Sequence, residues 1–283
     1  MASATRYRSR YIAGQLLAWW PAILLGLMVL MAILAPLIAP LDPNRQDLLG
    51  RLKLPGYEGR GGTYWLGTDE LGRDVLSRMI YGSRVSITVA VLSVLLSGIV
   101  GVTVGMLAGY LRGWPETILM RLVDIFLSIP AILLAIITVA VLGPSFFNVI
   151  LVLALTRWPR YARVAYGQTM SIARRPFVTL ARSMGCSVPR ALLLHILPNI
   201  ISPILVVATL EFGLMVLFEA GLSFLGLGVQ PPTASWGAML STGRNYVTSA
   251  WWIATFPGLA LFLLVLSANL IGDRVSDIIG KGR

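Results

Sequence analysis

The sequence predicts an all-α polytopic membrane protein with six transmembrane helices. Of its 283 residues, 57% are hydrophobic and 12% are charged, whereas a soluble domain of this length carries about 25% charged residues. The mean hydropathy is +0.80. The apolar residues form long runs without the alternation of a membrane β-barrel, so we expect the spans to be helices. The six candidate spans are residues 17–40, 85–110, 118–142, 146–157, 200–222 and 251–271.

A basic tail, residues 1–16, precedes the first span. It contains three arginines before an apolar stretch, a pattern that a cleaved signal peptide also shows. The stretch from Tyr11 to Leu41 is free of charge, which makes it longer than the about 7–15 apolar residues of a signal peptide. We therefore expect residues 17–40 to form a transmembrane helix that stays in the protein.

Residues 41–84 are expected to form an extracytoplasmic loop. Its first part, 41–64, contains two prolines and a GRGG run, which indicates irregular structure that either contacts another protein or serves as a spacer. Residues 69–81 carry apolar side chains on one side and charged ones on the other, which predicts an amphipathic helix at the outer membrane interface. The DELGRD run within it is too short for a calcium-binding EF-hand loop.

The remaining chain is expected to form a transmembrane core, residues 85–275, followed by a cytoplasmic tail, 276–283. The core contains a loop, residues 158–199, between the fourth and the fifth predicted spans. Residues 157–199 carry seven arginines and no acidic residue, and the N-terminal tail carries three arginines and no acidic residue. The positive-inside rule places both segments in the cytoplasm. Four predicted spans separate them, so the topology is self-consistent and both termini are expected to be cytoplasmic.

The local sequence of the basic loop predicts two short helices at an angle. Phe177–Met184 reads as the first helix, and Gly185 suits the left-handed position that ends it. Ser187 is a favourable N-cap for a second helix with Pro189 in its first turn, which we expect to stop before Pro198. Such a shape could fit into a groove of a partner protein. A loop that only anchors the protein to anionic lipid would be the simpler alternative.

This segment resembles the EAA motif of ABC-importer permeases. In that motif, E-A-A is followed by a glycine four residues after the last alanine and by a terminal L-P. Here TLA (179–181), Gly185 and LP (197–198) stand at these positions, with threonine in place of the glutamate. The resemblance implies that this is the coupling loop that docks on a cytoplasmic ATPase subunit. The residues that it assigns to the contact are Thr179, Ala181, Gly185, Ser187, Pro189, Arg190, His195, Leu197 and Pro198.

Two further stretches are similar to the peptide and nickel branch of the same family: WLGTDELGRDVLSRMIYGSRVS (65–86) and EAGLSFLGLGVQPPTASWGAML (219–240). The three motifs come in the family's order. The chain therefore resembles the second, C-type permease subunit of a dipeptide, oligopeptide or nickel ABC importer, with the type I importer permease fold.

The resemblance implies a set of partners and a location. The partners are a homologous second permease subunit, two cytoplasmic ATPase subunits, an extracytoplasmic solute-binding protein and the lipid bilayer of the bacterial cytoplasmic (inner) membrane. No nucleic-acid partner is expected. The solute is left open between dipeptides, oligopeptides, nickel chelates and glutathione-like molecules. The alternative function is a secondary transporter or channel that works without an ATPase.

The sequence offers no catalytic or metal-binding residues. A P-loop needs a lysine followed by serine or threonine, whereas Lys53 is followed by leucine and Lys281 by glycine. A single histidine excludes the common zinc motifs. We therefore expect no enzyme activity and no cofactor in this chain, with ATP and magnesium bound by the partner ATPases.

Two patterns inside the spans predict internal contacts. Ser97, Gly101, Gly105 and Gly109 recur every four residues, and such a stripe lets another helix approach closely, either within this chain or in the partner permease. Glu211 and Glu219 lie eight residues apart on roughly one face of the fifth span. Because a carboxylate in lipid is costly, we assign both to the translocation pathway. For Glu211 a hydrogen bond between helices is the alternative, ahead of substrate recognition, and Glu219 could instead lie at the outer interface.

Overall fold

The computed structural model describes residues 19–281, and most of them are helical. The tail predicted at residues 1–16, the start of the first predicted span and the last two residues lie outside this range. A 3-10 turn η1 (Leu48–Gly50), a π turn η2 (Ala191–Ile196) and two strands, β1 (Tyr57–Gly59) and β2 (Gly62–Tyr64), accompany the helices. The helices are α2 (Trp20–Ile33), α3 (Ala35–Ile38), α4 (Val75–Leu111), α5 (Trp114–Ser128), α6 (Ala131–Leu142), α7 (Phe146–Ile172), α8 (Pro176–Ser183), α9 (Val188–Arg190), α10 (Leu197–Phe224), α11 (Trp236–Arg244) and α12 (Trp252–Lys281).

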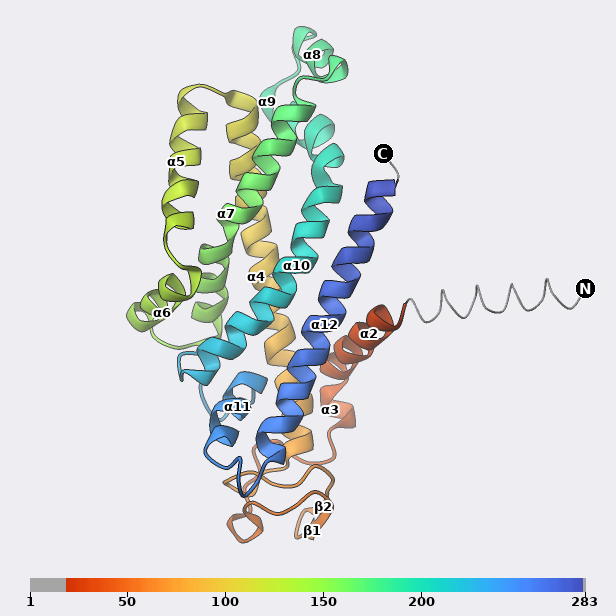
Figure 1. The fold of residues 1–283 in the computed structure, drawn as a ribbon, viewed down its shortest axis with the longest axis vertical. Helices are drawn as coiled ribbons and strands as arrows, with labels where there is room; N and C mark the ends of the chain where they lie inside the picture. Colours follow the sequence, from red (N-terminus) through yellow and green to blue (C-terminus); the bar gives the residue numbers. More distant parts are fainter. Residues whose placement is uncertain (1–18, 282–283) are drawn as a thin grey trace, which may run out of the picture.

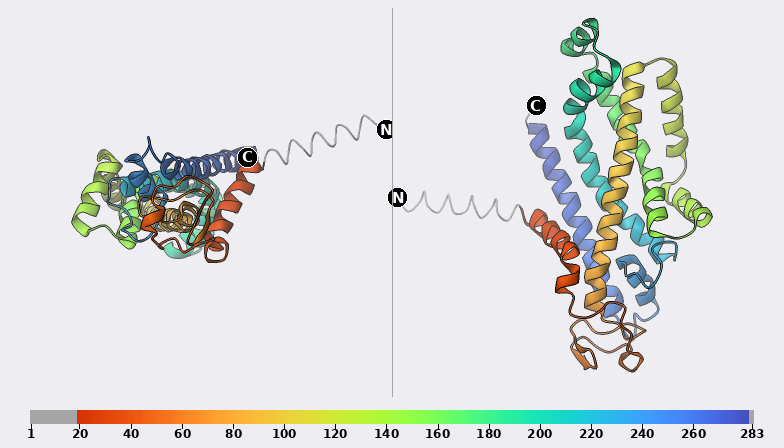
Figure 2. Two further views of the ribbon diagram at one scale, coloured as in Figure 1. Left: turned by 90° about the horizontal axis from the view of Figure 1, so that it is seen from below. Right: turned by 180° about the vertical axis from the view of Figure 1, so that it is seen from behind.

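The long helices form an upright bundle in which α4 packs against α7 and α10, and α12 packs against α10 and α2 (Figure 1). The strands β1 and β2 lie at one end of the bundle and α8 at the other, as the view from behind in Figure 2 also shows. We call these the sheet end and the α8 end. One large cluster of buried apolar side chains fills the half near the sheet end, and a second cluster joins α4, α7 and α10 to the segment around α8.

Each predicted span corresponds to a helix or a pair of helices. Three helical stretches are long and apolar enough to cross a membrane individually: α4, the unbroken run 188–224, and α12. α2 is a shorter apolar helix of 14 residues, and α7 is long but carries three arginines. The expected mostly helical fold is therefore found, whereas a count of six spans also requires α2, α7 and the pair of α5 and α6, because none of these helices is long and apolar enough to cross a membrane individually.

The predicted span 118–142 is broken in the middle. α5 and α6 meet at a bend of 89°. Ile129 lies at the bend with extended backbone angles, φ −94° and ψ 129°, because the ring of Pro130 disfavours a helical conformation in the residue before it. The expectation of one continuous helix was wrong at this point.

The helix α7 is longer than the predicted span 146–157. It begins after Ser145, whose side chain accepts a hydrogen bond from the backbone N–H of Asn148 at 3.2 Å, and it continues through Pro159 to Ile172. A proline can be tolerated inside a helix that is packed against neighbouring helices. The loop between the fourth and fifth spans therefore begins at residue 173 rather than at 158. At the other end of the chain, α12 extends to Lys281 through most of the predicted tail.

The charged run at the sheet end forms a buried turn. Asp69, at the centre of this turn, is 3% exposed and pairs with Arg73 at 2.7 Å and with Arg78 at 3.5 Å. Arg73 also pairs with Glu70 at 2.9 Å. Burial raises the pKa of the Glu70 carboxyl group above its ordinary value. The opposite charges thus neutralise one another inside the protein.

The prediction of a separate amphipathic helix at 69–81 is therefore wrong. Asp74 ends the turn, and its carboxylate accepts a hydrogen bond from the backbone N–H of Ser77 at 2.8 Å. This is the N-cap of α4. From Val75 onward the chain is one helix of 37 residues that continues into the membrane span. Sequence periodicity could not show that the charged side chains point into the protein. They are buried because they form ion pairs with one another within the turn and the start of α4.

Candidate functional site

The segment between α7 and α10 begins with a short helix, α8, and a turn at Gly185, as the sequence predicts. We call residues 173–196 the coupling segment. After α8 the chain turns at Gly185, which has φ +83°. The backbone N–H of Gly185 donates to the carbonyl of Arg182 at 3.0 Å, and that of Cys186 donates to the carbonyl of Ala181 at 3.1 Å. This pair of bonds is the Schellman motif, which favours glycine because a side chain is strained at positive φ.

The second half of the coupling segment differs from the prediction. Ser187 has the extended backbone of an N-cap, φ −65° and ψ 153°, but its side chain makes no capping hydrogen bond. Pro189 lies in the first turn of α9 as expected. The helix does not stop before Pro198, because α9, η2 and α10 follow one another without a break. Pro198 is tolerated since it lies in the first turn of α10, where the π turn passes into α-helix and a missing N–H costs little.

The coupling segment is fixed to the bundle on one side and exposed on the other. Val178 and Ile196 are 2% and 0% exposed and belong to the buried cluster at the α8 end. The opposite side carries large apolar side chains at high exposure, which is typical of a surface that another protein covers. These side chains are Leu180 (62%), Met184 (87%), Leu193 (57%) and Leu194 (61%).

The other predicted coupling residues surround this exposed surface. Arg190 and Pro198 are exposed, and Ala181, His195 and Leu197 are half-buried. The backbone carbonyl of His195 accepts a hydrogen bond from the side chain of Asn199 at 2.7 Å.

Thr179 borders a basic cavity at the foot of α8. The cavity has a volume of about 240 Å³ and is lined by three arginines, Arg112, Arg174 and Arg182, together with Tyr110. The hydroxyl of Thr179 donates to the backbone carbonyl of Arg175 at 3.3 Å. The position where the motif has glutamate thus lies beside a concentration of positive charge.

The stripe of small residues on α4 packs against α7 of the same chain. A side-chain carbon added at Gly101 would lie 2.3 Å from the carbonyl oxygen of Trp158, and one added at Gly105 would lie 2.3 Å from that of Ala162. Gly109 lies against Thr169 in the same way, and Ser97 is fully buried. Of the two alternatives for this stripe, the structure shows the contact within the chain.

Glu219 is enclosed between helices. It is 0% exposed, and its carboxylate accepts hydrogen bonds from Ser86 of α4 at 2.9 Å and from Ser223 of α10 at 2.8 Å. Ser235, just before α11, lies 3.3 Å from Ser223. Glu219 thus joins α4 to α10 inside the bundle.

Glu211 lies in a group of charges between α7 and α10. Its carboxylate lies 3.3 Å from Arg160 and 3.7 Å from Arg157. Arg157 is also packed over the ring of Phe218, with 4.1 Å between the guanidinium carbon and the ring centre. Sequence reasoning placed Arg157 at the end of the fourth span and Arg160 in the loop, and it missed this group. Their three-residue spacing after the apolar run 146–156 was the available signal that the helix continues.

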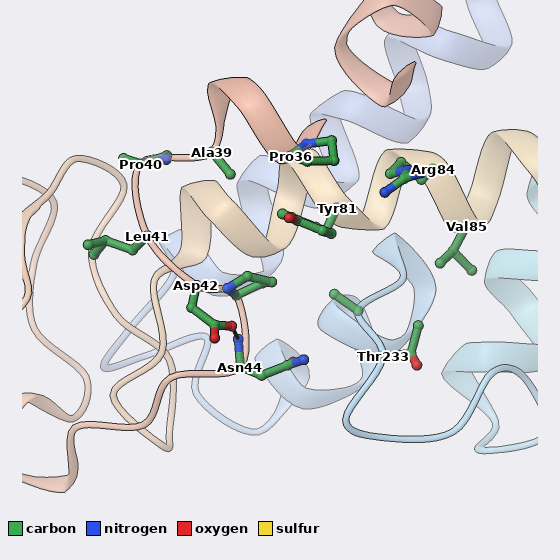
Figure 3. A pocket seen from close by; sticks show the side chains of 12 residues that line it. Pro36, Ala39, Pro40, Leu41, Asp42, Asn44, Tyr81, Arg84, Val85 and Thr233 are labelled. Carbon is green, nitrogen blue, oxygen red and sulfur yellow. Dashed lines mark hydrogen bonds between the residues drawn. The ribbon is translucent and has the colours of Figure 1, made fainter. Parts of the chain in front are cut away.

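The sheet end carries a pocket with a volume of about 710 Å³. Figure 3 shows it between the segment after α3, the start of α4 and the chain before α11. Asp42, Asn44, Tyr81, Arg84 and Thr233 supply its polar groups. In residues 19–281, no group of three or more His, Cys, Asp or Glu side chains is placed to hold a metal ion.

Comparisons with known proteins identify the family to which the chain belongs. Residues 101–283 match the family described as binding-protein-dependent transport system inner membrane component, and residues 15–55 match the N-terminal transmembrane domain of oligopeptide transport permease C. The predicted resemblance is therefore confirmed. The alternative of a transporter without an ATPase is not supported.

The chain is also similar to individual permeases. It is 43% identical to the di/tripeptide transport system permease protein of Pseudomonas aeruginosa over 89% of this chain and 83% of that protein. It is 41% identical to the probable D,D-dipeptide transport system permease protein of Escherichia coli over 95% and 88%, respectively. The fold resembles that of an inward-facing methionine ABC transporter, with a TM-score of 0.56 and 19% identity over 71% of this chain and 96% of that one.

Proposed function

This chain belongs to the family of binding-protein-dependent transport system inner membrane components, and we propose that it is the pore subunit of an ATP-driven importer of di- or oligopeptides. The relatives named for dipeptide transport support the solute class, because they match this chain over most of its length. The solute is delivered by a separate binding protein, and the pore itself catalyses no reaction.

We propose that the coupling segment docks on a cytoplasmic ATPase subunit. The observation that carries this proposal is the combination of a buried anchor and an exposed apolar surface on a segment that protrudes from the α8 end (Figure 1). A partner would cover that surface and gain its hydrophobic contact energy. Two ATPase subunits and a second, homologous permease complete the proposed complex, and ATP and magnesium bind to the ATPases.

The proposed orientation places the α8 end in the cytoplasm. Arginines with no neighbouring carboxylate partner in the described structure gather in the coupling segment and at the end of α4, which is what the positive-inside rule expects on the cytoplasmic side. These are Arg112, Arg174, Arg175, Arg182 and Arg190. With six crossings of the inner membrane, both termini are cytoplasmic. The sheet end, with its polar pocket, then faces the binding protein.

The helical run 188–224 gives this proposal a mechanical basis. It is an unbroken stretch of 37 residues, about 55 Å at 1.5 Å per residue. A displacement of the coupling segment by an ATPase subunit is therefore passed directly to the membrane part of α10. Glu211, through the buried Arg157 of α7, and Glu219, through Ser86 of α4, pass the movement on to the rest of the bundle.

Gly185 offers the sharpest test. Valine at φ +83° is strained by about 1–3 kcal/mol, and relief of that strain would redirect α9 relative to α8. In the reconstituted complex we expect Gly185→Val to lose ATPase stimulation by the loaded binding protein, and to retain less ATPase on the permease pair.

Gly185→Asn is the matched control, because asparagine tolerates a left-handed conformation. We expect it to keep most of the stimulation, and both variants to insert into the membrane normally. Full stimulation and retention in the valine variant would reject the proposed docking role and leave the segment as a charged anchor.

A further inference from the structure

Three arginines of α7 differ in their surroundings. Arg157 is buried, with 6% of its side chain exposed, whereas the side chains of Arg160 and Arg163 are 56% and 47% exposed. The two exposed arginines lie three residues apart, so they share one face of the helix. Gly167 continues this face toward the α8 end and is also exposed. The face is bordered by α5, through the pair of Arg163 with Asp124, and by α10, through the pair of Arg160 with Glu211.

Arg160 lies at a depth where the membrane is apolar. The neighbouring residues of α7, Trp158 and Tyr161, pack against Gly101 of α4. Gly101 is about 25 Å along α4 from the exposed Arg84 and about 16 Å from the exposed Arg112, at 1.5 Å per residue. A hydrocarbon core of about 30 Å fits between these two arginines and includes the level of Gly101. A half-exposed guanidinium at that depth does not face lipid, because the cost is too high.

The charges at this level do not balance within the described structure. Arg163 forms an ion pair with Asp124 of α5. Arg157 and Arg160 share one carboxylate, that of Glu211. One positive charge is therefore in excess, and it lies on the exposed side, at Arg160. Glu211 would remain paired with Arg157 if Arg160 turned toward another anion.

A polar cavity continues this face. It has a volume of about 320 Å³ and lies between α5 and the exposed side of α7. Glu116, Arg121, Asp124 and Tyr166 line it, and the hydroxyl of Tyr166 donates a hydrogen bond to Glu116. Ionisable groups at the wall of a cavity in a membrane protein mark a path for water and solute.

We propose that the exposed face of α7 formed by Arg160, Arg163 and Gly167 lines the solute path, and that Arg160 binds a carboxylate group of the passing solute. The inference rests on the proposed transport function and adds a residue and a chemical group to it. A guanidinium binds a carboxylate through two parallel hydrogen bonds. The bond to the buried Glu211 is 3.3 Å long and the Arg160 side chain is 56% exposed, so a solute can reach Arg160 and competes with a partner that Arg157 also holds. The face thus favours solutes with a free carboxylate, such as peptides.

The reaction rate of a thiol at position 167 can be used to detect the positive charge of Arg160. An added side-chain carbon at Gly167 meets no atom within 4 Å, so Gly167→Cys, in a Cys186→Ser background, fits without distortion. The complex in proteoliposomes is treated with two water-soluble methanethiosulfonates, one with a sulfonate and one with an ammonium group. We expect both to react. We expect the sulfonate-to-ammonium rate ratio to fall about threefold to tenfold on Arg160→Gln, since one charge about 10 Å away is removed.

A cysteine at Ile99, exposed at the same depth on α4, is the control for a lipid-facing position and should not react. No reaction at position 167 would show that protein or lipid covers the face, for example the partner permease, and would overturn the proposal. An unchanged rate ratio in Arg160→Gln would overturn it as well.

Transport gives the second readout. In the reconstituted complex, we expect Arg160→Gln to lower the amount of dialanine taken up per ATP hydrolysed at least threefold, and Arg160→Lys to restore most of it, while ATPase stimulation by the loaded binding protein stays near that of the unmodified complex. Equal losses of stimulation and uptake would show a merely structural role and reject Arg160 as a solute contact. Failure of the unmodified chain to retain an ATPase would instead refute the proposed function itself.

Discussion

Replacing Gly105 by alanine should force α4 and α7 apart. The added carbon would lie 2.3 Å from the carbonyl oxygen of Ala162 and 2.8 Å from the side chain of Ala165. An ordinary contact between such atoms starts near 3.4 Å, so α7 has to move by about 1 Å. Overpacking of this kind costs about 1–3 kcal/mol.

Gly98→Ala is a matched control on the same helix. There the added carbon would meet its nearest atom, in the ring of Tyr161, at 3.7 Å, which is an ordinary contact. Both substitutions gain about 1 kcal/mol of helix propensity, and this gain cancels in the comparison. The difference in stability between the two variants therefore measures the clash alone, and we expect it to be about 1–3 kcal/mol in favour of Gly98→Ala.

The measurement is thermal unfolding of the permease complex in nanodiscs, with the amount of assembled complex as a second readout. We expect the Gly105→Ala variant to melt about 2–10 °C below Gly98→Ala, and Gly105→Leu to lose most of the assembled complex. Equal melting temperatures for the two alanine variants would refute the close α4–α7 contact as the role of the stripe.

Three further outcomes are expected. A cysteine at Gly62, with Cys186 replaced, should react with an impermeant thiol reagent from outside intact cells, and labelling only after lysis would reverse the proposed orientation. Asp69→Ala should destabilise the sheet end by about 3–5 kcal/mol, because the buried Arg78 loses its carboxylate partner and Arg73 loses one of two, and faster proteolysis of residues 41–74 would report it. Glu219→Leu should cost about 2 kcal/mol or more in thermal unfolding, since buried hydroxyls lose their acceptor, whereas Glu219→Gln should cost less than half of that.

The sequence was most informative where the signal is local. The apolar runs predicted the order of the long helices, and the glycine and prolines around α8 predicted the turn at Gly185. The bend at Pro130 was also readable, because proline restricts the residue before it. Membrane hydropathy outweighed that local signal in the prediction of a single span.

Contacts between distant segments could not be predicted. Glu219 bonds to Ser86, 133 residues earlier, and Glu211 bonds to Arg160, 51 residues earlier. Arginines after an apolar run read as the start of a loop, since charge is expensive in lipid. In the structure Arg157 and Arg160 share a carboxylate from another helix. Only the packing of α7 on α10 reveals this.

The π turn η2 has a consequence for the direction in which α8 points. Its six residues, Ala191–Ile196, hold one residue more than an α-helix would need to cover the same arc, as the bond from the N–H of Leu197 to the carbonyl of Leu192 shows. Deletion of one exposed residue there, such as Leu193, would restore α-helical spacing. Because the α-helix covers the same arc with one residue fewer, α8 would keep its direction relative to α10. The π turn thus accommodates one extra residue without turning the docking surface away, so the length of this segment can change by one residue while its direction is kept.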